Sequence, residues 1–162
     1  MKPDFNQLWH QHRTGIARLV MSYEANHDVQ DELIQEIGLA IWRSLEKCRD
    51  EEKIKAFIYR IAHNQAINHV SRQVKQVDTT PLPCEQLDAN EGDHKSGIYT
   101  EKQHALLTAM RSLPMNQRQV ISLLFEGFSY KQIADITGFT MSHVGVLMNR
   151  GKYNLKERLD ES

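Results

Sequence analysis

The chain has 162 residues, of which 40% are hydrophobic and 25% are charged, and its formal net charge is −1. This composition is typical of a folded globular protein and excludes a disordered chain, while the net charge excludes a polycation that binds nucleic acid unaided. The sequence has no run of about 18 apolar residues, the length needed to span a membrane, and the N-terminus lacks the apolar core of a secretory signal. With only Cys48 and Cys84 as cysteines, we expect a cytoplasmic protein without disulfide bonds.

Two amphipathic helices are predicted first. Apolar residues at helical spacing between Phe5 and Tyr23 predict the first helix. The second is predicted to begin with Asp28 as its N-cap and to bury a face made of Leu33, Ile34, Ile37, Ala40, Ile41 and Leu45. Its opposite face carries a set of acidic and amide side chains, namely Asp28, Asp31, Glu32, Gln35 and Glu36. These suit a basic groove on a partner, although acids near a helix start also simply complement the helix dipole.

A third helix is predicted from about Lys53 to Arg72. Its inward face would hold Phe57, Ile58, Ile61, Ala62, Ile67 and Val70. Its outer face would hold rings, amides and cations, namely Tyr59, Arg60, His63, Asn64, Asn68, His69 and Arg72. Flat rings and amides on an exposed helix can stack on and hydrogen-bond to single-stranded bases, but they can also be ordinary polar surface. No strand-like alternation appears, so the predicted fold is all-α.

Residues 76–99 break the helical periodicity with Pro81, Pro83, Gly92 and Gly97. They carry one Lys against five Asp and Glu, or −4, whereas residues 1–75 carry 11 basic against 10 acidic residues and residues 100–162 carry 8 against 6. This composition indicates an acidic linker. We therefore predict two small helical domains, residues 1–75 and 100–162.

The segment after the linker predicts a helix-turn-helix over residues 129–152. Ser129 with Gln132 forms a capping box, Gly138 supplies the turn and Thr140 can cap the second helix. Upstream, Thr100 with Gln103 forms another capping box, and Pro114 and Gly127 end two further helices. The second helix of the motif buries a stripe of Val144, Leu147, Met148 and Gly151. Its other side is free to enter a DNA major groove, although a plain helical hairpin would show the same local signals.

Three stretches together resemble the extracytoplasmic-function sigma factors of bacterial RNA polymerase. They are DVQDELIQEIGLAIWRSL (28–45), KAFIYRIAHNQAINHVSRQ (55–73) and LTAMRSLPMNQRQVISLLFEGFSYKQIADITGFTMSHVGVLMNRGKYNLKERL (107–159). The resemblance implies an alternative sigma factor whose partners are core RNA polymerase and promoter DNA, and it leaves an anti-sigma factor open as a further partner. It implies that the acidic helix face binds polymerase. The third helix would read and melt the minus-ten element, and the C-terminal domain would read the minus-thirty-five element.

On this resemblance, the residues expected to bind DNA fall in two groups. Those of the third helix are Tyr59, Arg60, His63, Asn64, Asn68 and Arg72. Those of the helix-turn-helix are Lys131, Met141, Ser142, His143, Gly145, Val146, Asn149, Arg150 and Lys152. The chain departs from the family pattern where Gly145 and Leu147 replace common basic residues and where Ile54 and Phe57 replace large aromatics. With few cations near the groove, we expect the free chain to bind DNA weakly.

Other classes of function fit less well. The chain has no glycine-rich phosphate loop, nucleophile elbow or HExxH motif, so we expect no enzyme and no cofactor. His10 and His12 would point about 200° apart on a helix, so we expect no metal site. Two alternatives stay open: a helix-turn-helix regulator that acts as a dimer, and a degenerate sigma-like protein that binds polymerase or an anti-sigma factor without directing initiation.

Overall fold

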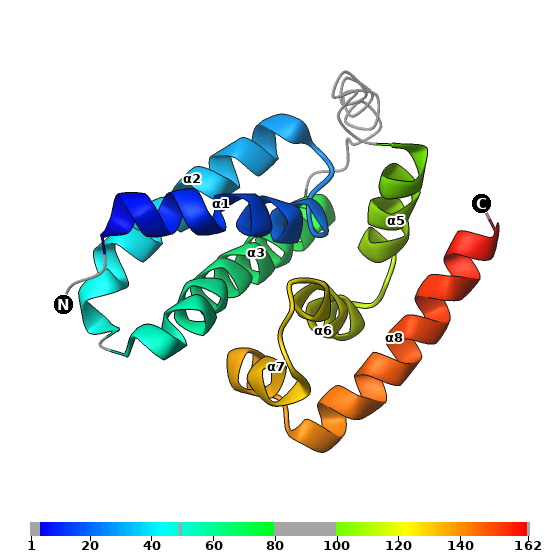
Figure 1. Ribbon diagram of the computed structural model, residues 1–162. Coiled ribbons are helices and arrows are strands. Elements are labelled where there is room, and N and C mark those ends of the chain that lie inside the picture. Colours follow the sequence, from blue (N-terminus) through cyan, green and yellow to red (C-terminus); the bar gives the residue numbers. More distant parts are fainter. Residues whose placement is uncertain (1–3, 49, 80–99, 162) are drawn as a thin grey trace.

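The computed structural model describes residues 4–48, 50–79 and 100–161, and within them every regular element is a helix. The first unit contains α1 (Phe5–Met21), α2 (His27–Ser44) and α3 (Ile54–Thr79), with two short 3₁₀ turns at Leu45–Lys47 and Glu51–Lys53. The second contains α5 (Glu101–Arg111), α6 (Met115–Phe125), α7 (Tyr130–Thr137) and α8 (Met141–Glu161). Figure 1 shows the two units side by side. The predicted all-α class with two helical domains is confirmed.

The first unit differs from prediction at two helix ends. Helix α2 begins one residue before Asp28, and Asn26 is its N-cap, because the Asn26 side chain accepts a hydrogen bond from the backbone N–H of Val29 at 3.1 Å. Helix α3 continues past the predicted end at Arg72 to Thr79, since no helix-breaking residue occurs before Pro81. Most of the predicted linker, including Cys84, lies outside the described residues.

Local capping sets the helix ends of the second unit as predicted. Both capping boxes, Thr100 with Gln103 and Ser129 with Gln132, are formed. Gly127 and Gly138 have φ angles of 93° and 87°, in the left-handed region where glycine is favoured because it lacks a Cβ. The Thr140 hydroxyl accepts a hydrogen bond from the backbone N–H of His143 at 3.1 Å and caps α8. The predicted helix-turn-helix is therefore formed by α7 and α8.

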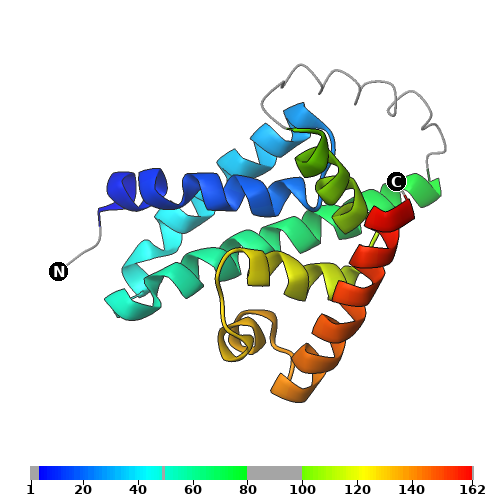
Figure 2. The ribbon, with the colours of Figure 1, turned by 45° about the vertical axis from the view of Figure 1, so that its right-hand side comes forward.

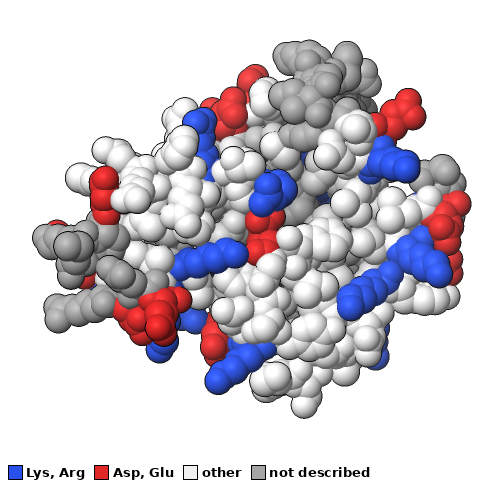
Figure 3. Space-filling view, in the orientation of Figure 1, with Lys and Arg blue, Asp and Glu red and all other residues white. Residues whose placement is uncertain are grey.

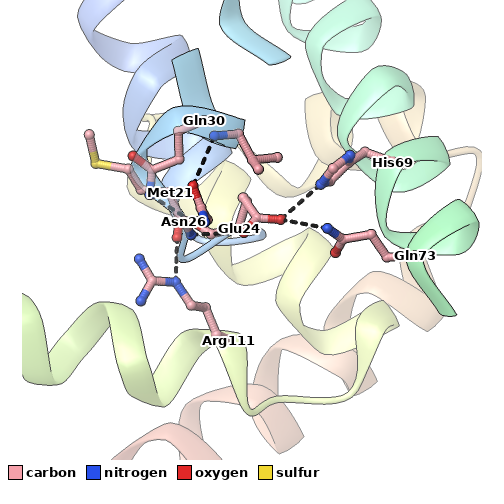
Figure 4. Close-up of polar contacts among 8 residues, drawn as sticks. Met21, Glu24, Asn26, Gln30, His69, Gln73 and Arg111 are labelled. Carbon is pink, nitrogen blue, oxygen red and sulfur yellow. Dashed lines mark hydrogen bonds and ion pairs between the residues drawn. The ribbon is translucent and has the colours of Figure 1, made fainter. Parts of the chain in front are cut away.

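A buried polar cluster holds the loop between α1 and α2 against the end of α3 (Figure 4). The Glu24 carboxylate, largely buried, pairs with His69 Nε2 at 2.8 Å and accepts a hydrogen bond from Gln73 Nε2 at 3.1 Å. Its backbone oxygen accepts a hydrogen bond from Gln30. The end of α1, just before this loop, meets the second unit, since Arg111 of α5 donates to the backbone oxygen of Met21 at 2.7 Å. His69, predicted to lie on an outer face, thus belongs to this internal cluster.

The two units pack directly on each other. The buried apolar side chains form one continuous cluster that runs from Ile16 in α1 through Ile58 in α3 to Ile133 in α7 and Leu155 in α8. Helix α7 lies against α3, and Figure 2, turned by 45°, shows α6 and α7 on the side of the molecule next to α3. We refer to this packing of the two domains as the closed arrangement.

Candidate nucleic-acid and partner interfaces

The outer face of α2 is polar at its start and apolar further along. Asp28, Asp31, Glu32, Gln35 and Glu36 are all exposed, as predicted. Sequence reasoning missed two residues on this face, because Leu39 and Trp42 are 46% and 60% exposed. Steps of four and three residues join Asp28, Glu32, Gln35, Leu39 and Trp42 into one row, and that spacing was visible in the sequence. We call this row, together with the neighbouring exposed Asp31 and Glu36, the α2 face.

On α3, a row of polar side chains is exposed at four-residue steps. It consists of Arg60, Asn64, Asn68 and Arg72, and we call it the α3 row. Positions four apart on a helix lie on the same side, so the amides and cations share one surface. The guanidinium of Arg60 also donates a hydrogen bond to the backbone oxygen of Asp135 in α7. The predicted exposure of these four residues is confirmed.

The predicted exposure of Tyr59 and His63 is wrong. Each is only 2% exposed, because α3 is covered on one side by its own domain and on another by the second domain. The Tyr59 ring meets Phe128 edge-on, with ring centroids 5.1 Å apart, and its hydroxyl donates to Glu126 Oε1 at 3.0 Å. Burial, followed by the negative charge of Glu126, raises the pKa of Tyr59.

His63 is enclosed by the surrounding protein. Burial lowers the pKa of its imidazole to about 4, so the ring is neutral at neutral pH. Its Nδ1 has no hydrogen-bond partner among the residues that the structure describes. A neutral, enclosed ring fits the interior of the closed arrangement and not a surface that meets bases in that arrangement.

The outer face of α8 is largely exposed, with the His143 ring beside that of Phe139 at a centroid distance of 4.9 Å. Met141, Ser142, His143, Val146, Asn149, Arg150 and Lys152 are exposed, as is Lys131 on α7, and Gly145 is half-buried. Ser142, Val146 and Asn149 continue at the next four-residue step into Tyr153, which is 64% exposed and was missed by sequence reasoning. The buried stripe of Val144, Leu147, Met148 and Gly151 lies on the opposite side, as predicted. We call the outer face of α8 the recognition face.

On the face drawn in Figure 3, the charges of the described residues do not form a continuous basic surface. On the side drawn in Figure 3, Lys and Arg side chains are scattered among neutral and acidic ones. Within residues 4–48, 50–79 and 100–161, no three His, Cys, Asp or Glu side chains are grouped as metal ligands require. In the same part of the chain, no helix combines the length and apolar character needed to cross a membrane.

Comparisons with known proteins identify the family. A family model described as Sigma-70 region 2 matches residues 8–76, and one described as Sigma-70, region 4 matches residues 103–155. RNA polymerase sigma factor SigV of Bacillus subtilis is 30% identical over 128 residues, which cover 78% of this chain and 74% of SigV. The ECF RNA polymerase sigma-E factor of Haemophilus influenzae is 28% identical over 145 residues, which cover 83% of this chain and 76% of that protein.

A solved structure shows the same fold. The sigma factor RpoE from Bartonella quintana, crystallised with the anti-sigma factor NepR, matches with a TM-score of 0.77 at 19% identity, over 97% of each chain. Two family regions in the same order, a full-length structural match and the exposed helix-turn-helix agree with one another. The chain therefore belongs to the sigma-70 family of RNA polymerase sigma factors, in its extracytoplasmic-function group, and is an alternative sigma factor that directs transcription initiation.

Proposed function

We propose that three separate surfaces divide the work of initiation: the α2 face binds core RNA polymerase, the α3 row contacts the minus-ten element, and the recognition face reads the minus-thirty-five element. The single observation that best supports this proposal is the exposure of all three surfaces on different helices. None of them needs a catalytic group, so the protein would act by binding alone, in the cytoplasm.

The α2 face combines the two features of a specific protein interface. Its carboxylates would complement a basic groove and orient the partner during encounter. Trp42 is the kind of large side chain that dominates interface energies when it becomes buried. The 60% exposure of this ring in the free chain leaves most of its surface available to a partner. We propose that Trp42 anchors the contact and that the acids set its register.

The α3 row would meet the promoter next. Asn64 and Asn68 can donate to and accept from base edges, while Arg60 and Arg72 can bind phosphates. Tyr59 and His63 are enclosed in the closed arrangement, and Tyr59, which contacts Phe128 and Glu126, could reach bases only after the domains separate. We therefore assign the first contacts to the exposed amides.

The recognition face has few charges, which indicates how it would read DNA. Ser142 and Asn149 can hydrogen-bond to base edges, and Met141 or Val146 can contact a thymine methyl. Lys131, Arg150 and Lys152 flank these residues and can bind phosphates. Because so few cations are available, the affinity for promoter DNA would come mainly from the assembled holoenzyme. An anti-sigma factor is a further partner that we propose by analogy with RpoE, which was solved bound to one.

The proposal is tested by transcription and binding with purified core polymerase. The double reversal Asp31→Lys/Glu32→Lys should weaken core binding by about 30-fold or more, and Trp42→Ala by about 10-fold or more, given the usual size of such interface losses. The matched control is Glu157→Lys/Asp160→Lys, which reverses two exposed charges at the far end of α8 and should leave core binding unchanged. Equal core affinity in all three variants, with normal helicity by circular dichroism, would remove α2 from the interface.

The two promoter surfaces are separated by the step that each variant affects. Asn64→Ala/Asn68→Ala should slow promoter opening, read by permanganate reactivity of unpaired thymines. Ser142→Ala/Asn149→Ala should instead weaken the closed complex, read by footprinting at low temperature. A symmetric dimer of the free chain on a palindromic site, with no response to core polymerase, would favour the dimeric regulator.

A further inference from the structure

A carboxylate of the second domain is buried in a cluster of donors from the first. Glu126 follows α6, and its side chain is only 5% exposed. Arg18 of α1 binds it through two nitrogens, with Nε to Oε2 and Nη2 to Oε1 both at 2.9 Å. The Tyr59 hydroxyl of α3 donates to Oε1 at 3.0 Å, and Lys55 Nζ donates to the backbone oxygen of Glu126 at 3.1 Å.

The first domain is shaped to receive this anion. Gly15 lies inside α1, where glycine destabilises a helix by about 0.5–1 kcal/mol relative to alanine. A Cβ at this position would stand 1.9 Å from Tyr59 Oη and 2.8 Å from Glu126 Oε1. The absence of a side chain at Gly15 thus leaves the space in which the Tyr59 hydroxyl and the Glu126 carboxylate meet. The guanidinium of Arg18 and the hydroxyl of Tyr59 bind the Glu126 carboxylate directly, and the ammonium of Lys55 lies beside it on the backbone oxygen of the same residue.

The cluster lies beside the α3 row. Lys55 and Tyr59 are on α3 itself, and Tyr59 immediately precedes Arg60, whose guanidinium is also engaged by a backbone oxygen of the second domain. Arg18 and Glu126 line a groove of about 210 Å³ between α1 and the helices α5 and α6, and the Arg18 side chain is 59% exposed. A second anion could therefore approach Arg18 from solvent as Glu126 leaves.

We propose that Arg18, Lys55 and Tyr59 form a binding site for a backbone phosphate of promoter DNA, and that Glu126 occupies this site as an intramolecular substitute in the closed arrangement. The inference rests on the proposed role of α3 in promoter contact. The planar fork of arginine binds carboxylate and phosphate with the same two-bond geometry. The two anions compete for one site, so DNA binding at this surface and closure of the domains exclude each other.

The ion pair can be broken from either side, and this gives the test. Glu126→Gln and Arg18→Ala both remove the pair, so both should open the full chain and increase its radius of gyration in small-angle X-ray scattering. They should differ in binding to a fluorescein-labelled single-stranded DNA of mixed sequence, followed by anisotropy over a salt series. Glu126→Gln should bind several-fold more tightly than wild type, because the competing anion is gone while the site remains.

Arg18→Ala should bind more weakly than Glu126→Gln by about 3- to 10-fold, and the slope of log affinity against log salt should fall by about 0.7, as expected for one lost phosphate contact on a single strand. Arg18→Lys keeps the charge and should keep the slope. Arg13→Ala removes another exposed cation of α1 and serves as the matched control, with compactness and slope expected near wild type. Circular dichroism of each variant verifies that the helices are intact.

Equal gains in affinity for Glu126→Gln and Arg18→Ala would overturn the phosphate site, because Arg18 would then only hold the domains together. Unchanged scattering and unchanged DNA affinity in both variants would overturn the competition. Asn64→Ala/Asn68→Ala is measured in parallel to separate this inference from the proposed function. Weaker binding in that variant keeps α3 at the promoter whatever the ion-pair variants do, whereas wild-type binding there counts against α3 as a promoter surface.

Discussion

Helices α3 and α8 are both proposed to contact promoter DNA, yet they differ in how far their proposed contact residues are exposed. Every proposed contact residue of α8 is at least partly exposed, whereas on α3 two of six, Tyr59 and His63, are enclosed at 2% exposure each. Helix α8 packs on α5, α6 and α7, all of its own domain. Helix α3 packs on α1 and α2 and also against α7 of the other domain.

This contrast shows that surface properties depend on the arrangement of the domains. The recognition face of α8 is exposed in the closed arrangement, whereas the side of α3 that we propose to contact bases is only partly exposed. Recognition of duplex DNA and contact with melted bases would therefore have different structural requirements. Duplex recognition by α8 would need no rearrangement of this chain. Contact of Tyr59 with melted bases would need Glu126 and Phe128 to separate from α3.

The strongest test of the covered side of α3 is the pH dependence of stability. The folded-state pKa of His63 is about 4, below its ordinary value of 6.5. As the pH falls below 6.5 the unfolded chain takes up the proton first, so stability is intact above pH 6.5 and is lost as the pH falls toward 4. A shift of this size corresponds to about 3 kcal/mol. Between pH 6.5 and 4, urea denaturation should show that the free energy of unfolding falls by about 3 kcal/mol less in His63→Gln than in wild type.

The exposed neighbour variant Asn64→Gln is the control for that measurement and should keep the wild-type pH dependence. If His63→Gln and wild type lost the same free energy of unfolding as the pH falls, the His63 ring would be exposed to solvent in the folded protein. The contrast between the two helices would then disappear.

The inward side of α8 is tested by Gly151→Ala. An added Cβ would stand 2.8 Å from Ile121 Cγ1 and 3.5 Å from Gln117 Cβ, both on α6. Overpacking of this kind destabilises by about 1–3 kcal/mol, so the urea midpoint should fall. Unchanged stability would show that α6 and α8 are further apart than the structure places them.

The outward side of the same helix is tested by Gly145→Ala, which should have the opposite sign. An added Cβ there would meet nothing within 4 Å, and alanine favours a helix over glycine by about 0.5–1 kcal/mol. Thermal unfolding should therefore shift upward. A lower melting temperature would mean that this face packs against something in the free chain.

The smallest expected effect is on the flank of the recognition face. Lys152→Ala should weaken binding of the full chain to duplex DNA by about 3-fold, or about 0.6 kcal/mol, and lower the log–log salt slope by about 0.9. Lys102→Ala on α5 removes another exposed positive charge and should not change the slope. Equal slopes for both variants would show that Lys152 makes no phosphate contact.

Sequence alone determined the local elements, because their signals lie within a few residues. The capping boxes at Thr100 and Ser129 and the left-handed glycines Gly127 and Gly138 occur where the residue types require them. The one cap assigned wrongly, Asp28 in place of Asn26, differs by two residues between side chains that cap about equally well. The helix-turn-helix and the acidic face of α2 followed from the same short-range rules.

Only the tertiary structure decided what covers α3. Helical periodicity marks the face that a helix buries in its own domain, and it contains no information about a second domain that packs on the remaining surface. The Arg18–Glu126 ion pair joins residues 108 positions apart, and neither side chain has a local signal for its partner. Burial of Tyr59 depends on that long-range packing, because its ring and hydroxyl contact Phe128 and Glu126 of the second domain, and no local signal in the sequence predicts those contacts.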